Sequence, residues 1–119
     1  MKIVNVPDPA SCLVRVREGD RLVEVEKEMT FQGYLKSVCK AYDVFAKGVE
    51  NGRVYGKIMD VIESMNGHKT VNFEDDHFKL LRAAADAQQW STPDINRMVS
   101  EKFYPALEKA QDVKIPVEK

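Results

Sequence analysis

Two kinds of hydrophobic spacing divide the chain. Between Cys12 and Glu26, valines alternate with charged residues, which is typical of half-buried β-strands. From Phe31 onward, apolar residues recur three and four positions apart, which indicates helices that each bury one face. The sequence therefore predicts an α+β fold: an N-terminal β-hairpin, or three strands, packed on a bundle of three to four α-helices.

The hairpin has a predicted register. A two-residue turn at Gly19-Asp20, or a four-residue loop, places four valines on one face and opposite charges on the other. The pairs are Val14 with Val25, Arg15 with Glu24, and Val16 with Val23. A three-residue loop would set valines opposite charged residues. We expect the valine face to pack on the following helix, so that Val16→Asp would place a charge in the core.

The longest helical pattern runs from Thr30 to Met65, with Thr30 as a candidate N-cap. A break near Gly48 with a restart near Arg53 is favoured, because Glu50-Asn51-Gly52 has turn chemistry. A continuous helix that aligns Gly48, Gly52 and Gly56 is the alternative. In either case Asn66-Gly67 should end the region.

The remaining segments complete one domain over residues 1–119. Residues 1–10 are predicted to form an edge strand or an arm, because Pro7 and Pro9 follow the apolar run. Residues Lys69–Phe73 are predicted to form a third strand beside the hairpin. A helix should run from Glu74 to about Gln88. The last helix is capped by Ser91 or by Thr92 with Pro93 at its first position, and Pro105 interrupts it. Residues 112–119 are predicted to form a frayed tail.

Composition narrows the classes of partner. The 18 basic and 19 acidic residues give a net charge of −1, which provides no bulk attraction for nucleic acid or an anionic membrane. No run is long and apolar enough to span a bilayer, and no signal peptide is recognisable, so a cytoplasmic protein is expected. Cys12 and Cys39 are expected to be reduced.

Candidate chemistry is sparse. Glu74-Asp75-Asp76-His77 brings carboxylates beside an imidazole, but acids in a first helical turn also complement the helix dipole. A pair of Cys39 with His68 would need proximity in space. We therefore predict no catalytic residue, no cofactor and no metal.

Two aromatic residues fall outside the helical stripes. Trp90 lies between two predicted helices beside Gln89, and Tyr104 precedes Pro105. With Ser91 as the cap, Trp90 would form a hydrophobic staple with Ile95. The alternative hypothesis is a partner-binding surface made of Gln89, Trp90 and Tyr104, because Trp and Tyr are frequent in binding hot spots.

The entry Glu28-Met29-Thr30-Phe31 into a helix, followed by Phe73-Glu74-Asp75-Asp76-His77-Phe78 at a later helix start, resembles small accessory or assembly proteins of tailed bacteriophages and prophages. The likeness covers about residues 12–110. It implies a non-enzymatic protein of the host cytoplasm or virion that binds another protein, as an assembly chaperone, a virion component or an inhibitor of a host system. Self-association is compatible with it. The alternative is a small nucleic-acid-binding regulator that uses the two C-terminal helices.

Overall fold

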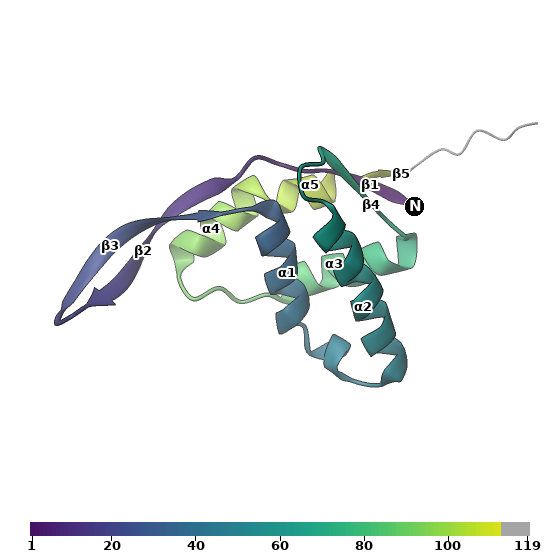
Figure 1. Cartoon of the computed structure of the whole chain (residues 1–119), viewed down its shortest axis with the longest axis horizontal. Coiled ribbons are helices and arrows are strands. Elements are labelled where there is room, and N and C mark those ends of the chain that lie inside the picture. The colour runs from purple at the N-terminus through teal and green to yellow at the C-terminus, as the bar shows by residue number, and fades with distance from the viewer. Residues whose placement is uncertain (113–119) are drawn as a thin grey trace, which may run out of the picture.

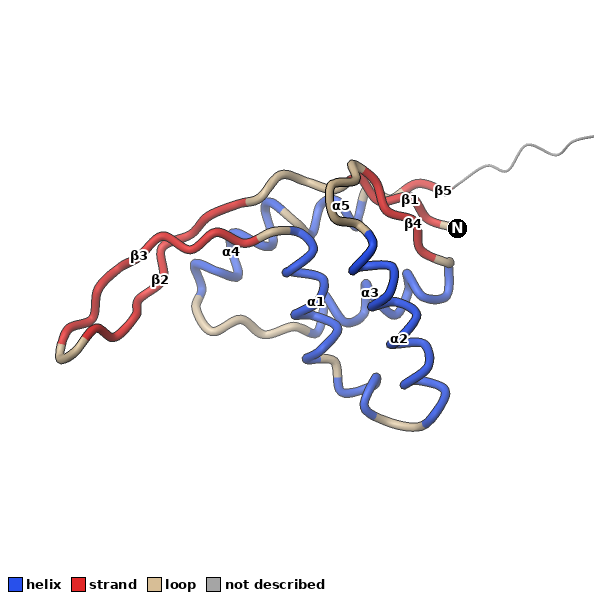
Figure 2. Tube along the Cα trace, viewed as in Figure 1, coloured by secondary structure: helices blue, strands red, loops and turns tan. Residues whose placement is uncertain are grey.

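The computed structural model describes residues 1–112 and has the predicted α+β class (Figures 1 and 2). Its elements follow in chain order. The strands are β1 Lys2–Asn5, β2 Ala10–Glu18, β3 Arg21–Met29, β4 Thr70–Phe73 and β5 Gln111–Asp112. The helices are α1 Phe31–Ala41, a 3₁₀ turn Asp43–Ala46, α2 Val49–Ser64, α3 Asp75–Ala87, α4 Pro93–Lys102 and α5 Tyr104–Glu108.

The hairpin β2–β3 has the predicted register. Val14 lies opposite Val25, Arg15 opposite Glu24, and Val16 opposite Val23. The turn is the two-residue Gly19-Asp20, and Gly19 has a φ of 63°, which suits glycine. Alternation and turn chemistry were therefore sufficient to fix the pairing.

The position of the hairpin differs from the prediction. It projects from the helices as an arm (Figure 1), and the radius of gyration of 16.3 Å exceeds the roughly 13 Å of a compact 100-residue domain. Val16 and Val25 are 40% and 38% exposed, so the valine face does not pack along α1. The base of the arm contacts the body instead, where β2 packs on α4 and Val14 reaches the core. The reason is geometric: α1 starts directly after β3 and runs away from the arm.

A separate three-stranded sheet has the order β4-β1-β5, with antiparallel pairs. The predicted edge strand in residues 1–10 is therefore wrong in its placement, because β1 is the middle strand. The prolines come after β1 has ended, so they remove no hydrogen bond from it. The strand predicted at Lys69–Phe73 exists as β4, but it pairs with β1 and not with the hairpin.

The region from Thr30 to Met65 is broken, as favoured, but at different residues. Helix α1 ends at Ala41, and α2 begins at Val49 after Gly48, whose φ is 84°. Glu50-Asn51-Gly52 is helical and not a turn, because Gly48 already supplies the change of direction and its carbonyl accepts from the N–H of Gly52 at 3.2 Å. Thr30 is the N-cap, and its hydroxyl accepts from the N–H of Gly33 at 3.1 Å.

The C-terminal helices settle the choice of cap. The Thr92 hydroxyl accepts from the N–H of Ile95 at 3.2 Å, and Pro93 opens α4. The helix ends before Pro105, as predicted, and α5 continues the chain. Of the tail predicted over residues 112–119, Asp112 belongs to β5, where its carboxylate lies 2.7 Å from Lys2 Nζ, and the rest lies outside the described residues.

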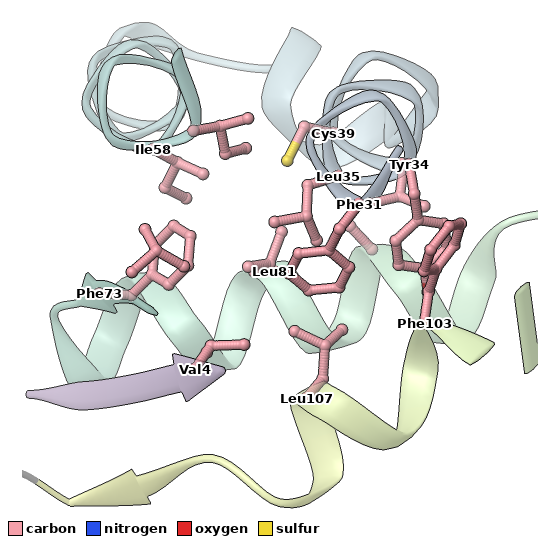
Figure 3. Close-up of a cluster of buried hydrophobic side chains, with 14 of the residues drawn as sticks. Val4, Phe31, Tyr34, Leu35, Cys39, Ile58, Phe73, Leu81, Phe103 and Leu107 are labelled. Atoms are coloured by element: carbon pink, nitrogen blue, oxygen red, sulfur yellow. The ribbon is translucent and has the colours of Figure 1, made fainter. Parts of the chain in front are cut away.

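The core lies between the five α-helices and strands β1 and β4, and Figure 3 shows part of it. Its largest side chains include a ring cluster in which Phe103 lies 5.9 Å from Phe31 and 5.3 Å from Tyr34, measured between ring centroids. Leu35, Leu81 and Leu107 fill the space beside the rings and are at most 1% exposed. This core fixes the positions of α1, α3 and α5, which carry the residues described next.

Candidate functional site

Trp90 and Tyr104, predicted to bind a partner, line one pocket of about 190 Å³. The third predicted residue, Gln89, is exposed and lies outside the lining, where its neighbour Gln88 takes part instead. The pocket is bounded by α1, the end of α3, α4 and the start of α5. Its lining consists of Tyr34, Ala85, Asp86, Gln88, Trp90, Asn96, Val99, Ser100 and Tyr104.

Trp90 is held by stacking and not by a staple. Its ring lies nearly parallel to that of Tyr34, at 5.8 Å between centroids and 18° between planes. Because Thr92 caps α4, Trp90 is two residues before the cap and cannot occupy the staple position that a Ser91 cap would give it. The staple interpretation is wrong, and the half-buried indole forms part of the pocket wall.

The hydroxyl of Tyr104 joins α5 to α3. It accepts a hydrogen bond from Arg82 Nη2 at 3.1 Å and donates to Asp86 Oδ1. The Arg82 guanidinium also lies over the Tyr104 ring, 5.7 Å from its centroid. The Arg82 hydrogen bond lowers the pKa of Tyr104, but hydrogen bonding to Asp86 and partial burial outweigh it, so the pKa is raised. These contacts hold Asp86 at the pocket edge.

Tyr34 is a pocket residue that the sequence did not single out, because it falls among the positions spaced three and four apart that predict the buried side of the helix after Phe31. Its side chain is 2% exposed. Burial raises its pKa, and the charges of Tyr104 and Asp86 add to this effect. The residue type could have indicated Tyr34 as a site residue, because a tyrosine within an apolar stripe carries a hydroxyl that must reach a partner or water.

The arm is the second candidate surface. It exposes apolar side chains on both faces, with Val16 and Val25 on one and Leu13 and Leu22, 56% and 68% exposed, on the other. Arg15 Nε lies 3.8 Å from Glu24 Oε1, as the register predicts. Within residues 1–112, β2 and β3 form a two-stranded sheet, so no strand pairs with the outer edge of β3.

Glu74, Asp75, Asp76 and His77 lie at the start of α3, and Cys39 lies in α1. His77 Nε2 lies 3.4 Å from Glu74 Oε2, while Asp75 and Asp76 fall in the first turn of α3. Residues 1–112 contain no group of three or more His, Cys, Asp or Glu side chains arranged to hold a metal ion. Cys39 is buried in α1, and burial raises its pKa to about 12, which disfavours the nucleophilic thiolate.

The two C-terminal helices do not form a packed helix-turn-helix pair. Helix α3 packs on α1 and α2, whereas α4 packs on α5 and the base of β2. On α4, Arg97 Nε lies 3.3 Å from Glu101 Oε1, which offsets the positive charge on its exposed side. The main packing partners of α3 and α4 are therefore different elements.

Comparison with known proteins returned no significant match to a protein-family model, a curated protein or a solved structure. Across residues 1–112, none of the helices combines the length and apolar character needed to cross a membrane. The pocket and the arm are therefore the two candidate sites.

Proposed function

We propose that this protein acts by binding another protein through the β2–β3 arm, without catalysis. The observation that supports the proposal is an arm whose apolar side chains are exposed on both faces within the described chain. An isolated two-stranded hairpin is marginally stable, and exposed apolar surface of this kind is typical of interaction sites. A role as a phage or prophage accessory factor, either an assembly chaperone, a virion component or an inhibitor of a host system, is part of the same proposal.

The open edge of β3 is suited to adding a strand. In a two-residue hairpin the pair beside the turn is hydrogen-bonded, and hydrogen-bonded and non-hydrogen-bonded pairs then alternate. Glu24 and Glu26 fall in non-hydrogen-bonded pairs of this register, so their backbone N–H groups face outward. An added strand would use them for pairing by β-augmentation.

The charges on β3 define the chemistry of the partner. Glu24, Glu26 and Glu28 share one face, while Val23 and Val25 lie on the other. Glu26 is opposite Leu13 and Glu28 is opposite Ser11, so neither has a basic residue directly opposite it. The partner strand should therefore alternate basic residues with apolar ones, because opposite charges stabilise cross-strand pairs.

A designed peptide tests this proposal. The peptide acetyl-KVKVKVK-amide, fluorescently labelled, should bind the full protein with an increase in anisotropy, whereas acetyl-EVEVEVE-amide should not. Hydrogen exchange measured by NMR should then slow at the amides of Glu24 and Glu26, with little change at Val23 and Val25, which already face β2. Glu26→Pro removes one outward N–H on an edge where proline is tolerated, and it should weaken binding more than Glu26→Gln does.

Other results would replace the proposal. Peptide binding that leaves the Glu24 and Glu26 amides unprotected would exclude strand addition. Concentration-dependent dimerisation that protects the same amides would make a second copy of this chain the occupant. Specific binding of duplex DNA, lost in Arg97→Ala, would favour the nucleic-acid alternative.

A further inference from the structure

We propose that the pocket between α1, α3, α4 and α5 binds a primary alkylammonium group, supplied either by a lysine side chain of another protein or by a free diamine. The inference goes beyond the function proposed for the arm and does not depend on it. It rests on the Tyr34 hydroxyl, which makes no hydrogen bond within residues 1–112, on the hydrogen-bonding character of the lining, and on the aromatic wall.

The Tyr34 hydroxyl opens into the pocket. The side chain is 2% exposed, yet among the hydrogen bonds of residues 1–112 none involves this hydroxyl. The same residues leave no fully buried side-chain oxygen or nitrogen without a partner, so the Tyr34 oxygen must reach solvent. Tyr34 lines this pocket, which provides the opening. A nearly buried hydroxyl in that position is free to bond to a ligand.

The remaining polar groups of the lining favour a donor-rich cation. Asp86 uses one oxygen for Tyr104, which leaves the other as an acceptor. Gln88 uses its amide nitrogen to donate to the Gln89 carbonyl at 2.9 Å, so its side-chain oxygen is also available. None of the nine lining residues is basic, and an ammonium group brings three N–H donors and the charge that Asp86 would pair with.

The walls and the size suit the methylene stem of the same group. Trp90, which is half-buried and stacked on Tyr34, contributes aromatic surface on which aliphatic carbons pack and near which a cation is favoured. The pocket volume is about 190 Å³, whereas a cavity of roughly 150 Å³ accommodates benzene. A lysine side chain, with four methylenes and one nitrogen, has a comparable number of heavy atoms.

Trp90 is the single tryptophan of the chain, so its fluorescence reports on the pocket directly. We would titrate the full protein with Nα-acetyl-lysine methylamide and with Nα-acetyl-norleucine methylamide, which has a similar stem without the charge. The lysine compound should change the Trp90 emission saturably, and the norleucine compound should bind at least about tenfold more weakly, as expected for the loss of a charged hydrogen bond.

Matched variants locate the binding. Asp86→Asn should weaken binding of the lysine compound by about tenfold, and Tyr34→Phe should weaken it by a smaller factor. Asp60→Asn, which removes an exposed carboxylate on α2 away from the pocket, should change nothing. Asp86 is itself exposed, so its variant should stay folded, and its circular dichroism and thermal midpoint serve as controls.

The outcomes decide the proposal and the source of the group. Tighter binding of the lysine compound than of cadaverine supports a protein side chain, and the reverse supports a free diamine. Absence of saturable binding by both amines, equal binding of norleucine and lysine compounds, or full binding by Asp86→Asn would overturn the site. None of these results depends on whether the arm binds a strand.

Discussion

The arm and the three-stranded sheet are built from the same kind of sequence but differ in what covers them. Val4 and Val71, which face each other in β1 and β4, are 0% and 5% exposed. Val16 and Val25 in the arm alternate just as regularly and are 40% and 38% exposed. Alternation thus identifies the residues that share a face, but it does not say whether anything packs on that face.

The difference arises from the helices near each sheet. Helix α2 packs on β4 and α5 packs on β1, so the small sheet is covered by the body. The arm has nine residues in each strand, and a strand rises by about 3.3 Å per residue, so its tip lies far beyond α4. On the valine face of the hairpin, Val14 near the base is therefore half-buried, whereas Val16 nearer the tip is exposed.

The largest effect should come from a charge placed in the covered sheet. Val4→Asp puts an unpaired carboxylate at a site with 0% exposure, and we expect a loss of roughly 4 kcal/mol or more in the free energy of unfolding. Urea denaturation followed by circular dichroism measures it. Val4→Ala, which only shortens the side chain, should cost less. A Val4→Asp protein with an unchanged midpoint would show that β1 does not lie inside the body in solution.

The two cysteines give a second comparison, because Cys39 lies in the body and Cys12 in the arm. Burial raises the pKa of Cys39 from 9.0 to about 12, so its thiol stays neutral in the folded state while the unfolded state begins to ionise near pH 9. The contribution of the neutral Cys39 thiol to the free energy of unfolding is therefore complete below about pH 9 and is lost as the pH rises toward 12. The loss should reach about 3 kcal/mol by pH 11.

Denaturation at several pH values tests this contribution. Burial also raises the pKa of Tyr34, so the native protein should show a steeper loss of stability than Cys39→Ala, in which the tyrosine effect remains. Cys12→Ala controls for removal of a thiol. If the free energy of unfolding falls equally steeply with pH in the native protein and in Cys39→Ala, water must reach Cys39 in the folded state.

Local signals predicted the elements well, whereas placement in space needed information that lies far apart in the chain. Turn chemistry and alternation gave the hairpin register, and Thr30 was identified as a cap from its side chain alone. The pairing of β1 with β4 joins residues about 70 positions apart, and no local pattern encodes such a choice. The arm was misplaced for the same reason.

The candidate site was predicted in part. Trp90 and Tyr104 were selected because each lay outside an apolar stripe, and both line the pocket. Asp86 and Tyr34 were missed because each fits an ordinary helical position, one on an exposed side and one on a buried stripe. Asp86 contributes because α3 and α5 bring it to Tyr104, and Tyr34 contributes because its ring stacks on Trp90; the sequence alone shows neither contact.

The smallest effect should come from a charge on the uncovered part of the arm. The sequence pattern predicted that Val16→Asp would be severe, but the side chain is 40% exposed and its carboxylate would reach water, so we expect a cost within about 1 kcal/mol. Val14→Asp is the matched control on the same face of the same strand, because Val14 is half-buried and packs against the core, and it should cost clearly more. If both variants lose the same large amount of stability in urea denaturation, the outer valines must be covered in solution. Repeating the measurement at several protein concentrations then shows whether a second copy provides the cover, since only that stabilisation grows with concentration.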